Sequence, residues 1–505
     1  MSLRPSWIAA CCLAAIFLAS GASRPLCAQS IGLPYSVHGH DPQHTGLSQV
    51  ACQPLNRILW QTPVDLAPQY SGNELLIHYG APVITRQNTV IVPVKTGATT
   101  GFQIEAHLAA NGSLLWSLPT DYAVPAHDWY PSCGIALTPK NRLYFPAAGG
   151  TVCYRDTPDQ ATGATGRIAF YGLASYLSNT ATYNANIQIS TPITSDRYGN
   201  IYFGYSVTGT TPTNLVSGIA AISVDGTANW ISATAAAGDP TITQVVQNCA
   251  PALSNDHRTV YMAVSASGYG GYLLALDTVS LATMGKVRLK DVKTPASDSI
   301  LSDDGTASPM VGPDGDVYFG VLDDPLSSNQ YRGWMLHFDK TLSQSKLPGA
   351  FGWDDTASIV PASLVPSYQG PSSYLILSKY NNYASGANKV AILDPNVSEI
   401  DSVTGALVMN EVISQLGPTP DPSHPNIPGA VREWCINTVA VDPITKSAVI
   451  HSEDGSVYRW DFTSNSLTQA VTLTQGLGTA YTPSVIGVDG VAYVIADAIL
   501  FAIGQ

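Results

Sequence analysis

The chain has 505 residues, including 43 Gly and 35 Pro, and its formal net charge is −13. Charged residues make up 12% of the sequence, about half of the roughly 25% found in average globular domains, and hydrophobic residues make up 45%. A disordered chain is rich in charge and poor in apolar residues, and a long coiled coil is about half Ala, Glu, Lys, Leu and Arg. Neither class fits, and the many turn residues favour a large all-β protein.

The N-terminus has the pattern of a secretory signal. The apolar stretch at 7–20, WIAACCLAAIFLAS, is shorter than the about 20 residues that a membrane span needs, and it matches the hydrophobic region of a signal peptide. We expect cleavage after Ala28, with Ala22 as the alternative. Residues 1–28 would then be a signal peptide and 29–505 a single exported domain, periplasmic or extracellular. We do not expect an integral membrane protein.

The charge of the exported part limits its partners. Residues 1–28 contain two Arg and no acidic residue, so 29–505 would carry 21 basic and 36 acidic side chains, a net charge of −15. Binding to nucleic acid depends on basic surface that displaces counterions. We therefore expect no nucleic-acid partner, and we expect a monomer.

The opening segment HGHDPQHTG contains His38, His40 and His44 beside Asp41. Imidazoles at this density could hold Zn²⁺ or Cu²⁺ if they converge. The alternative, which we favour, is a polar and solvated loop in which Asp41, with the Thr and Gly at 45–46, serves as a turn residue.

A repeated unit then recurs along the chain. Each copy has a small residue, often followed by Pro, then an apolar strand, a turn rich in Asp, Asn and Gly, and a second strand that often contains Tyr. Alternating apolar positions on both sides of a polar turn are the signal of a β-hairpin. The eight copies lie at 81–93, 133–146, 191–204, 249–263, 308–320, 360–377, 435–451 and 482–495.

Third and fourth strands follow most of the hairpins. FQIEAHLAANGSLLW (102–116) and GIAAISVDGTANW (218–230) each contain an apolar strand, a tight turn and an outer strand that ends in Trp. Each unit is therefore predicted to be a four-stranded antiparallel meander, and eight meanders predict an eight-bladed β-propeller. The last unit lacks its outer strand, and ILWQTPVD (58–65) resembles LLWSLPTD (114–121). We expect 58–65 to be the strand that closes the eighth blade.

Five cysteines lie beyond the predicted signal, which is an odd number, so at least one cannot pair within the chain. No C-x-x-C motif is present, which removes the usual zinc, thioredoxin-like and c-type haem sites. Cys133 and Cys153 fall on the first and third strands of one blade, roughly 9–10 Å apart. Because disulfide bonds need Cα atoms within about 7 Å, we expect that these two are not bonded. Cys249 and Cys435 stand at the same place in their blades as Cys133, where a small buried residue suits the crowded channel.

The endings Ala109 to Trp116 and Ala221 to Trp230 resemble the repeats of pyrroloquinoline-quinone-like β-propellers, and GHDPQHTGLS (39–48) resembles the D-x-x-x-T-G-x-S stretch that begins many such exported propellers. The resemblance covers nearly all of 29–505. It implies the propeller fold, but the superfamily contains both quinoprotein dehydrogenases and a non-catalytic scaffold of outer-membrane protein assembly. Function has to be argued from the site.

The resemblance implies markers for a quinone-dependent enzyme: an adjacent Cys-Cys disulfide, a calcium shell and an Asp base. The single Cys-Cys pair here is Cys11-Cys12, inside the predicted signal. No residue can therefore be assigned as a ligand of the quinone, and we do not expect that cofactor.

The segments before the first strand of each blade converge on one mouth of the channel. Their carboxylates could bind a hard cation such as Ca²⁺ or work as an acid–base pair, and their aromatic rings could stack on a sugar or a peptide. The alternative is that they are turn, cap and packing residues. Our candidate ligand contacts are Asp128, Trp129, Asp304, Trp353, Asp355, Arg432, Glu433 and Trp434.

These observations predict an exported binding or scaffold protein, with a protein or carbohydrate ligand at the mouth and no assigned catalytic residue. The alternative is an enzyme, either a degenerate quinoprotein oxidoreductase or a carbohydrate-active hydrolase or lyase that uses the mouth carboxylates. An enzyme predicts a deep pocket in which carboxylates such as Asp355 and Glu433 approach each other with perturbed pKa values. A scaffold predicts a plugged channel and an exposed apolar or acidic patch elsewhere.

Overall fold

The computed structural model describes residues 35–72, 74–75, 77–98, 101–124, 133–267, 269–302, 305–475 and 482–505. All of them belong to one compact unit, Gly32–Gln505. The predicted signal peptide and the candidates Asp128, Trp129 and Asp304 lie outside the described residues.

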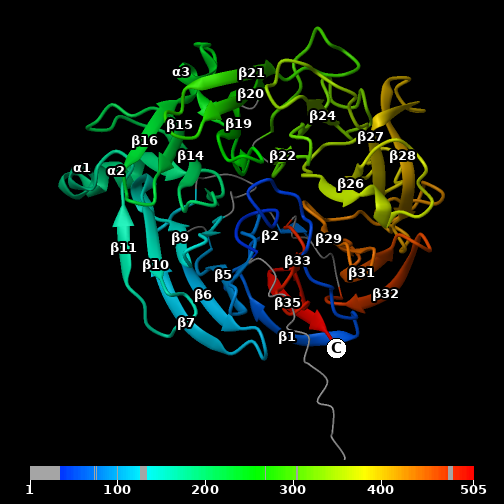
Figure 1. Ribbon diagram of the computed structural model, residues 1–505, viewed down its shortest axis with the longest axis horizontal. Helices are drawn as coiled ribbons and strands as arrows, with labels where there is room; N and C mark the ends of the chain where they lie inside the picture. Colours follow the sequence, from blue (N-terminus) through cyan, green and yellow to red (C-terminus); the bar gives the residue numbers. More distant parts are fainter. Residues whose placement is uncertain are drawn as a thin grey trace, which may run out of the picture. The chain divides into compact units, whose positions relative to one another are not determined.

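Eight antiparallel sheets succeed one another around a centre, and the colours of Figure 1 pass once around the ring until β35 lies beside β1. The eight-bladed β-propeller predicted from the repeats is confirmed. We number the blades in chain order from β4.

The first four blades contain the following strands. Blade 1 has β4 (Val83–Ile84), β5 (Thr89–Lys95), β6 (Phe102–Leu108) and β7 (Leu114–Thr120); blade 2 has β8 (Ala136–Leu137), β9 (Arg142–Pro146), β10 (Val152–Asp156) and β11 (Thr165–Ile168). Blade 3 has β12 (Ile187–Ile189), β13 (Thr194–Ser195), β14 (Ile201–Val207), β15 (Gly218–Ile222) and β16 (Ala228–Ser232); blade 4 has β17 (Gln244–Val245), β18 (Ala252–Leu253), β19 (Thr259–Ala266), β20 (Tyr269–Asp277) and β21 (Thr283–Arg288).

The other four blades complete the ring. Blade 5 has β22 (Met310–Val311), β23 (Val317–Val321) and β24 (Trp334–Phe338); blade 6 has β25 (Ser358–Pro361), β26 (Tyr374–Tyr380), β27 (Lys389–Ile400) and β28 (Leu407–Leu416). Blade 7 has β29 (Ala440–Asp442), β30 (Ser447–His451), β31 (Ser456–Asp461) and β32 (Ser466–Thr472); blade 8 has β33 (Val485–Ile486), β34 (Ala492–Ala496), β35 (Ile499–Gly504) and β1 (Arg57–Pro63).

A few elements stand outside the sheets of the blades. They are the hairpin of β2 (Tyr70–Ser71) and β3 (Glu74–Leu75), the helices α1 (Leu173–Ser178), α2 (Thr180–Asn186) and α3 (Ala233–Ala237), and the short 3₁₀ turns η1 (Ala148–Gly150) and η2 (Ala362–Leu364). None of the described helices is long and apolar enough to cross a membrane.

The ring is closed by β1, which covers most of the segment 58–65 that the sequence predicts as the closing strand. β1 pairs antiparallel with β35, from Arg57 opposite Gly504 to Pro63 opposite Ile499. Trp60 on β1 is buried, and its Nε1 donates to the carbonyl oxygen of Ala109 at 2.7 Å. The beginning and the end of the propeller are therefore joined in one blade.

Blade 5 departs from the predicted four strands. Outside β24 the chain makes two isolated bridges, Met335 with Gly349 and Phe338 with Ser345, instead of a fourth strand. Pro348 lies between these bridges and has no backbone N–H to donate. A proline of this kind interrupts a ladder, which accounts for the missing strand.

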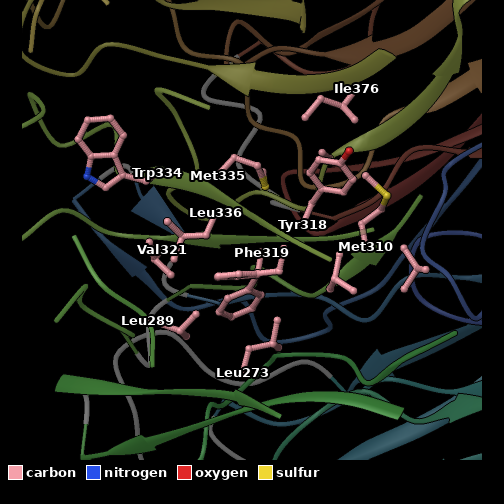
Figure 2. Close-up of a cluster of buried hydrophobic side chains, with 14 of the residues drawn as sticks. Leu273, Leu289, Met310, Tyr318, Phe319, Val321, Trp334, Met335, Leu336 and Ile376 are labelled. Carbon is pink, nitrogen blue, oxygen red and sulfur yellow. The ribbon is translucent and has the colours of Figure 1, made fainter. Parts of the chain in front are cut away.

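The core consists of apolar side chains that fill the space between neighbouring blades. Figure 2 shows the cluster around blade 5, in which Phe319 lies close to Leu273 of blade 4 and Leu336 belongs to the same cluster. Ile376 of blade 6 belongs to the same cluster. The five described cysteines form no disulfide bond, and the prediction that Cys133 and Cys153 are not bonded is confirmed.

Candidate functional site

The propeller has two distinct ends. We call the end at which one blade is connected to the next the upper face, and the end that carries the turns between the first and second strands of each blade the lower face. The predicted ligand contacts all precede first strands, so they belong to the upper face.

The lower end of the channel is occupied by 35–48, which we call the axial segment, in blue at the centre of Figure 1. It exchanges backbone hydrogen bonds with the innermost strands of six blades. The amides that donate to it are those of Leu137 to Ser36, Leu253 to Pro42, Val311 to Gln43, Ile359 to Thr45 and Val441 to Gly46, and Tyr35 forms a bridge with Ile84. The N-terminal part of the domain is thus a plug that blades 1, 2, 4, 5, 6 and 7 hold.

The D-x-x-x-T-G-x-S motif explains the shape of the axial segment. The Asp41 Oδ1 accepts from the backbone amides of Gln43 and Thr45, both at 3.1 Å, and Oδ2 accepts from the Thr45 hydroxyl. Gly46 has a positive φ of 62°, and a Cβ there would lie 2.4 Å from the Val439 carbonyl oxygen. The prediction that Asp41 and its neighbours are turn residues is confirmed.

The expectation that this loop is solvated is wrong. His38, His40 and His44 are 8%, 6% and 0% exposed. The loop is buried because the innermost strands of the blades surround it. Its carbonyl oxygens accept hydrogen bonds from the amides of these strands, so the buried backbone groups have partners.

Two of these histidines face each other inside the channel. The rings of His38 and His44 meet edge to face with centroids 5.5 Å apart, and His44 Nδ1 donates to the Pro309 carbonyl oxygen at 2.7 Å. Burial lowers the pKa of His38 to about 3 and that of His44 to about 4. Both rings are neutral at pH 7. Among the described residues no group of three or more His, Cys, Asp or Glu side chains is placed to hold a metal ion.

Above the plug lies a buried polar network that we call the axial cluster: Thr306, Asp354, Asp355, Lys379, Asn437 and His451. The Asp354 Oδ1 accepts from the amide and the hydroxyl of Thr306, both at 2.6 Å. Lys379 Nζ donates to the Asp354 carbonyl oxygen at 3.0 Å and lies 3.7 Å from its carboxylate. Asn437 of blade 7 donates to the Thr306 hydroxyl before blade 5, so the network joins blades that are not neighbours.

Asp355 is the most perturbed acid of the axial cluster. Its Oδ2 accepts from the Ser378 hydroxyl at 2.7 Å, and its Oδ1 has no hydrogen-bond partner among the described residues. Burial raises the pKa of Asp355 to about 7, against the opposing effect of Lys379. Burial also lowers the pKa of His451 to about 3, and the charge of Lys379 adds to this effect. A carboxyl group that changes protonation near neutrality is common at functional sites.

The two predicted tryptophans that are described lie inside the fold. Trp434 is fully buried, and its ring meets that of Tyr458 edge to face at 5.8 Å. Trp353 is half-buried and lines a cavity of about 20 Å³ together with Asp354 and Phe319. That volume has room for about one water molecule. Their role as ligand contacts stays a prediction.

Arg432 lines an open cleft of about 780 Å³ on the upper face, which we call the upper cleft. Its walls come from the connections after β28 and after β32, the turn between β30 and β31, the hairpin of β2 and β3 and the turn before β35. The lining residues are Tyr70, Gly72, Thr419, Pro420, Pro422, Arg432, Glu453, Asp454, Gln475 and Asp497.

Arg432 is held in the upper cleft by two acids at long range. Its Nη1 lies 3.5 Å from Glu453 Oε2 and 3.9 Å from Asp421 Oδ1, both longer than a good hydrogen bond. Burial raises the pKa of Glu453, and the charge of Arg432 opposes that shift. Glu433 stands beside this pair in the chain, and its carbonyl oxygen accepts from the Glu453 amide at 2.9 Å.

The remaining polar groups of the upper cleft are oriented by the fold. Asp454 Oδ2 accepts from the hydroxyls of Thr419 and Tyr458 at 2.6 and 2.7 Å. Asp497 Oδ1 accepts from the hydroxyl of Tyr70 at 2.9 Å, while half of Tyr70 stays exposed. Burial and the Asp497 carboxylate raise the pKa of Tyr70 to about 12.

Sequence reasoning found Arg432 but missed the other polar residues of the upper cleft. Glu453, Asp454 and Asp497 lie in turns between second and third strands, and Tyr70 lies in the long connection from β1 to blade 1. These turns share the upper face with the segments before first strands. The sequence signal for this part of the cleft is the acidic turn HSEDGS (451–456), which lies between a second and a third strand.

The residues of the described axis do not fit a quinone held with a metal ion. Asp354 is engaged with both Thr306 and Lys379, and no metal-binding group of side chains accompanies them in the described chain.

No family model matches the sequence, and no curated protein matches it either. Solved structures do match. A europium-containing methanol dehydrogenase is 9% identical with a TM-score of 0.55, over 91% of this chain and 88% of that one. The quinohemoprotein alcohol dehydrogenase from Comamonas testosteroni is 11% identical with a TM-score of 0.51, over 94% of this chain and 77% of that one. BamB from Moraxella catarrhalis is 12% identical with a TM-score of 0.43, over 80% and 92%.

Likeness at 9–11% identity is evidence of the fold and of nothing further. The chain has the β-propeller fold that these two dehydrogenases have.

Proposed function

We propose that this protein is an exported binding protein, which holds a ligand or a partner at its upper face without catalysing a reaction. The observation that carries the proposal is the upper cleft of about 780 Å³, which is open and lies beside an axis filled by the chain itself. Ligand pockets typically measure about 300–1,000 Å³.

The filled axis supports binding rather than catalysis. The axial segment occupies the lower end of the channel, and the axial cluster ties Asp354 to Thr306 and Lys379 above it. In the upper cleft, Asp454 and Asp497 accept hydrogen bonds from their own fold. Carboxylates that accept hydrogen bonds from the protein itself are fixed in position and can orient a ligand. A general acid, by contrast, must be able to transfer a proton to its substrate.

Native mass spectrometry of the protein, purified from cells that express the full chain, tests the proposal. We expect a neutral glycan or a protein from a panel to bind at one copy per chain, and we expect the substitution Arg432→Ala to weaken this binding at least tenfold. Arg197→Ala is the matched control, because Arg197 lies on the lower face and donates to the Asp256 carbonyl oxygen. A stoichiometric bound quinone, or turnover of a panel member, would contradict the proposal.

A second candidate function rests on Asp355. A buried carboxyl with a pKa raised to about 7 and one oxygen without a partner among the described residues is suited to general acid or base chemistry. The corresponding activity would be that of a degenerate quinoprotein oxidoreductase or of a carbohydrate-active hydrolase or lyase. Loss of turnover in Asp355→Asn, with unchanged binding at the upper cleft, would favour this candidate.

A further inference from the structure

We infer that the ligand of the upper cleft is an uncharged oligosaccharide, held between the ring of Tyr70 and the guanidinium of Arg432. The inference rests on the proposed function, because it names the ligand class of the same cleft.

The first observation is an oriented aromatic ring. Tyr70 is 50% exposed, and its hydroxyl is anchored on Asp497 at 2.9 Å. The anchor fixes the ring, so that stacking on it costs little side-chain entropy. Pro420 and Pro422 line the same cleft and extend its apolar surface. A flat apolar surface of this kind matches the C–H face of a pyranose. Tyr is common at binding sites because its ring is apolar while its hydroxyl stays hydrogen-bonded.

The second observation is a guanidinium with donors to spare. Among the described residues, the carboxylate oxygens that face Arg432 Nη1 lie on Glu453 and Asp421, at 3.5 and 3.9 Å. Both distances are longer than a good hydrogen bond, so the N–H groups of Nη1 can turn to a ligand oxygen. Burial raises the pKa of the Glu453 carboxyl, and the charge of Arg432 opposes that shift. Sugar hydroxyls both donate and accept, and they can use the guanidinium and the carboxyl group together.

The third observation is the balance of charge. Three carboxylates line the upper cleft, and Asp421 stands behind Arg432. A phosphate or a uronate would meet these carboxylates at short range, and like charges disfavour each other there. A basic peptide would be attracted by the carboxylates, but its cations would compete with Arg432 for Glu453. An uncharged polyhydroxylated chain can hydrogen-bond to the guanidinium and to the carboxylates. It is neither repelled by the carboxylates nor in competition with Arg432 for Glu453.

The test is isothermal titration calorimetry on the purified full-chain protein. The ligands are the tetrasaccharides of α-1,4-glucose, β-1,4-glucose and β-1,4-N-acetylglucosamine, and a hexalysine peptide. We expect one tetrasaccharide to bind at one copy per chain, with an affinity that changes less than twofold between 0.05 and about 0.5 M salt, because no ion pair forms. Tyr70→Ala and Arg432→Ala should each weaken binding at least tenfold, and Tyr70→Phe should weaken it less than Tyr70→Ala.

Tyr198→Ala is the matched control, because Tyr198 is a similarly exposed tyrosine on the lower face. It should leave the affinity unchanged. Unfolding midpoints equal to that of the parent protein would show that the variants are folded.

Each other result overturns the inference in a distinguishable way. Salt-sensitive binding of hexalysine that Arg432→Ala strengthens, without binding of any tetrasaccharide, would refute the sugar and keep the proposed function. Tetrasaccharide binding that survives both Tyr70→Ala and Arg432→Ala would move the site away from the upper cleft. If neither probe class binds, the inference fails, whereas the proposed function is decided by the glycan and protein panel of the mass spectrometry test.

Discussion

The amide of Val441 in blade 7 donates to the carbonyl oxygen of Gly46 at 2.8 Å, which joins the axial segment to a strand almost 400 positions later in the chain. Five further blades make comparable contacts with the axial segment. The plug is therefore a part of the fold that every contacted blade helps to position. Its stability should depend on the few residues that allow the chain to pass so close to the innermost strands.

Gly46→Ala should destabilise the protein strongly. The new Cβ would lie 2.4 Å from the Val439 carbonyl oxygen and 2.7 Å from the Ser358 hydroxyl, and φ at this position is +62°. We expect a loss of about 2 kcal/mol or more in the free energy of unfolding, measured in urea. Gly405→Ala is the control, because φ is +71° there but no atom lies within 4 Å of the new Cβ. Equal losses in the two variants would mean that the close approach at Gly46 has no energetic importance.

Trp60→Ala should weaken the junction between the closing strand β1 and blade 1. Trp60 is buried, donates to Ala109 at 2.7 Å and has Gly112 directly against its ring. Truncating a buried tryptophan costs about 3–5 kcal/mol, and we expect this range in denaturant unfolding. Trp230→Ala on the outer strand β16 is the control, since Trp230 is partly exposed and should cost less than about 1 kcal/mol. A cost at Trp60 as small as that at Trp230 would contradict closure by this strand.

The repeats predicted the blades because every blade contains the same local pattern of strands and turns. An apolar strand, a turn and a second strand carry the period-2 pattern wherever they occur. The closing strand was predictable for the same reason, since 58–65 carries the pattern of an outer strand such as 114–121.

What escaped prediction lies between the repeats. α1 and α2 occupy a connection with no apolar periodicity long enough to indicate a helix, and they are stabilised by packing of Tyr176 and Tyr183. The burial of the axial segment could not be read from its polar residues, because its partners are backbone groups of six blades. The upper cleft combines Tyr70 with Asp497, which meet only when the ring closes.

Acid should destabilise the protein through the buried histidines. The pKa values of His38, His44 and His451 are lowered to about 3, 4 and 3, whereas an unfolded chain titrates near 6.5. Between these values the unfolded state binds more protons, so the free energy of unfolding falls as the pH drops below 6.5, by up to about 1.4 kcal/mol per pH unit for each ring.

Urea unfolding between pH 7 and 4.5 checks this. His44→Gln should lower the stability at pH 7 and should also reduce the slope with pH. His424→Gln is the comparison, because the ring of His424 is 37% accessible and contacts Asp421 at 2.6 Å, and it should change the slope less than His44→Gln does. A slope that none of the buried substitutions alters would place the acid sensitivity elsewhere.

Asp355 should act in the opposite direction. Its pKa is raised to about 7 in the folded protein, above the value near 3.9 of an unfolded chain. Between these values the folded state binds the extra proton, so the stability that Asp355 contributes is complete at acidic pH and is lost as the pH rises from about 4 through 7.

Asp355→Asn keeps the group neutral. We expect its stability relative to the parent protein to improve between pH 5 and 8, on the order of 3 kcal/mol, in urea unfolding. Asp225→Asn, at an exposed turn, should show no such trend. A difference between Asp355→Asn and the parent that stays constant with pH would mean that Asp355 is ionised throughout, paired with Lys379.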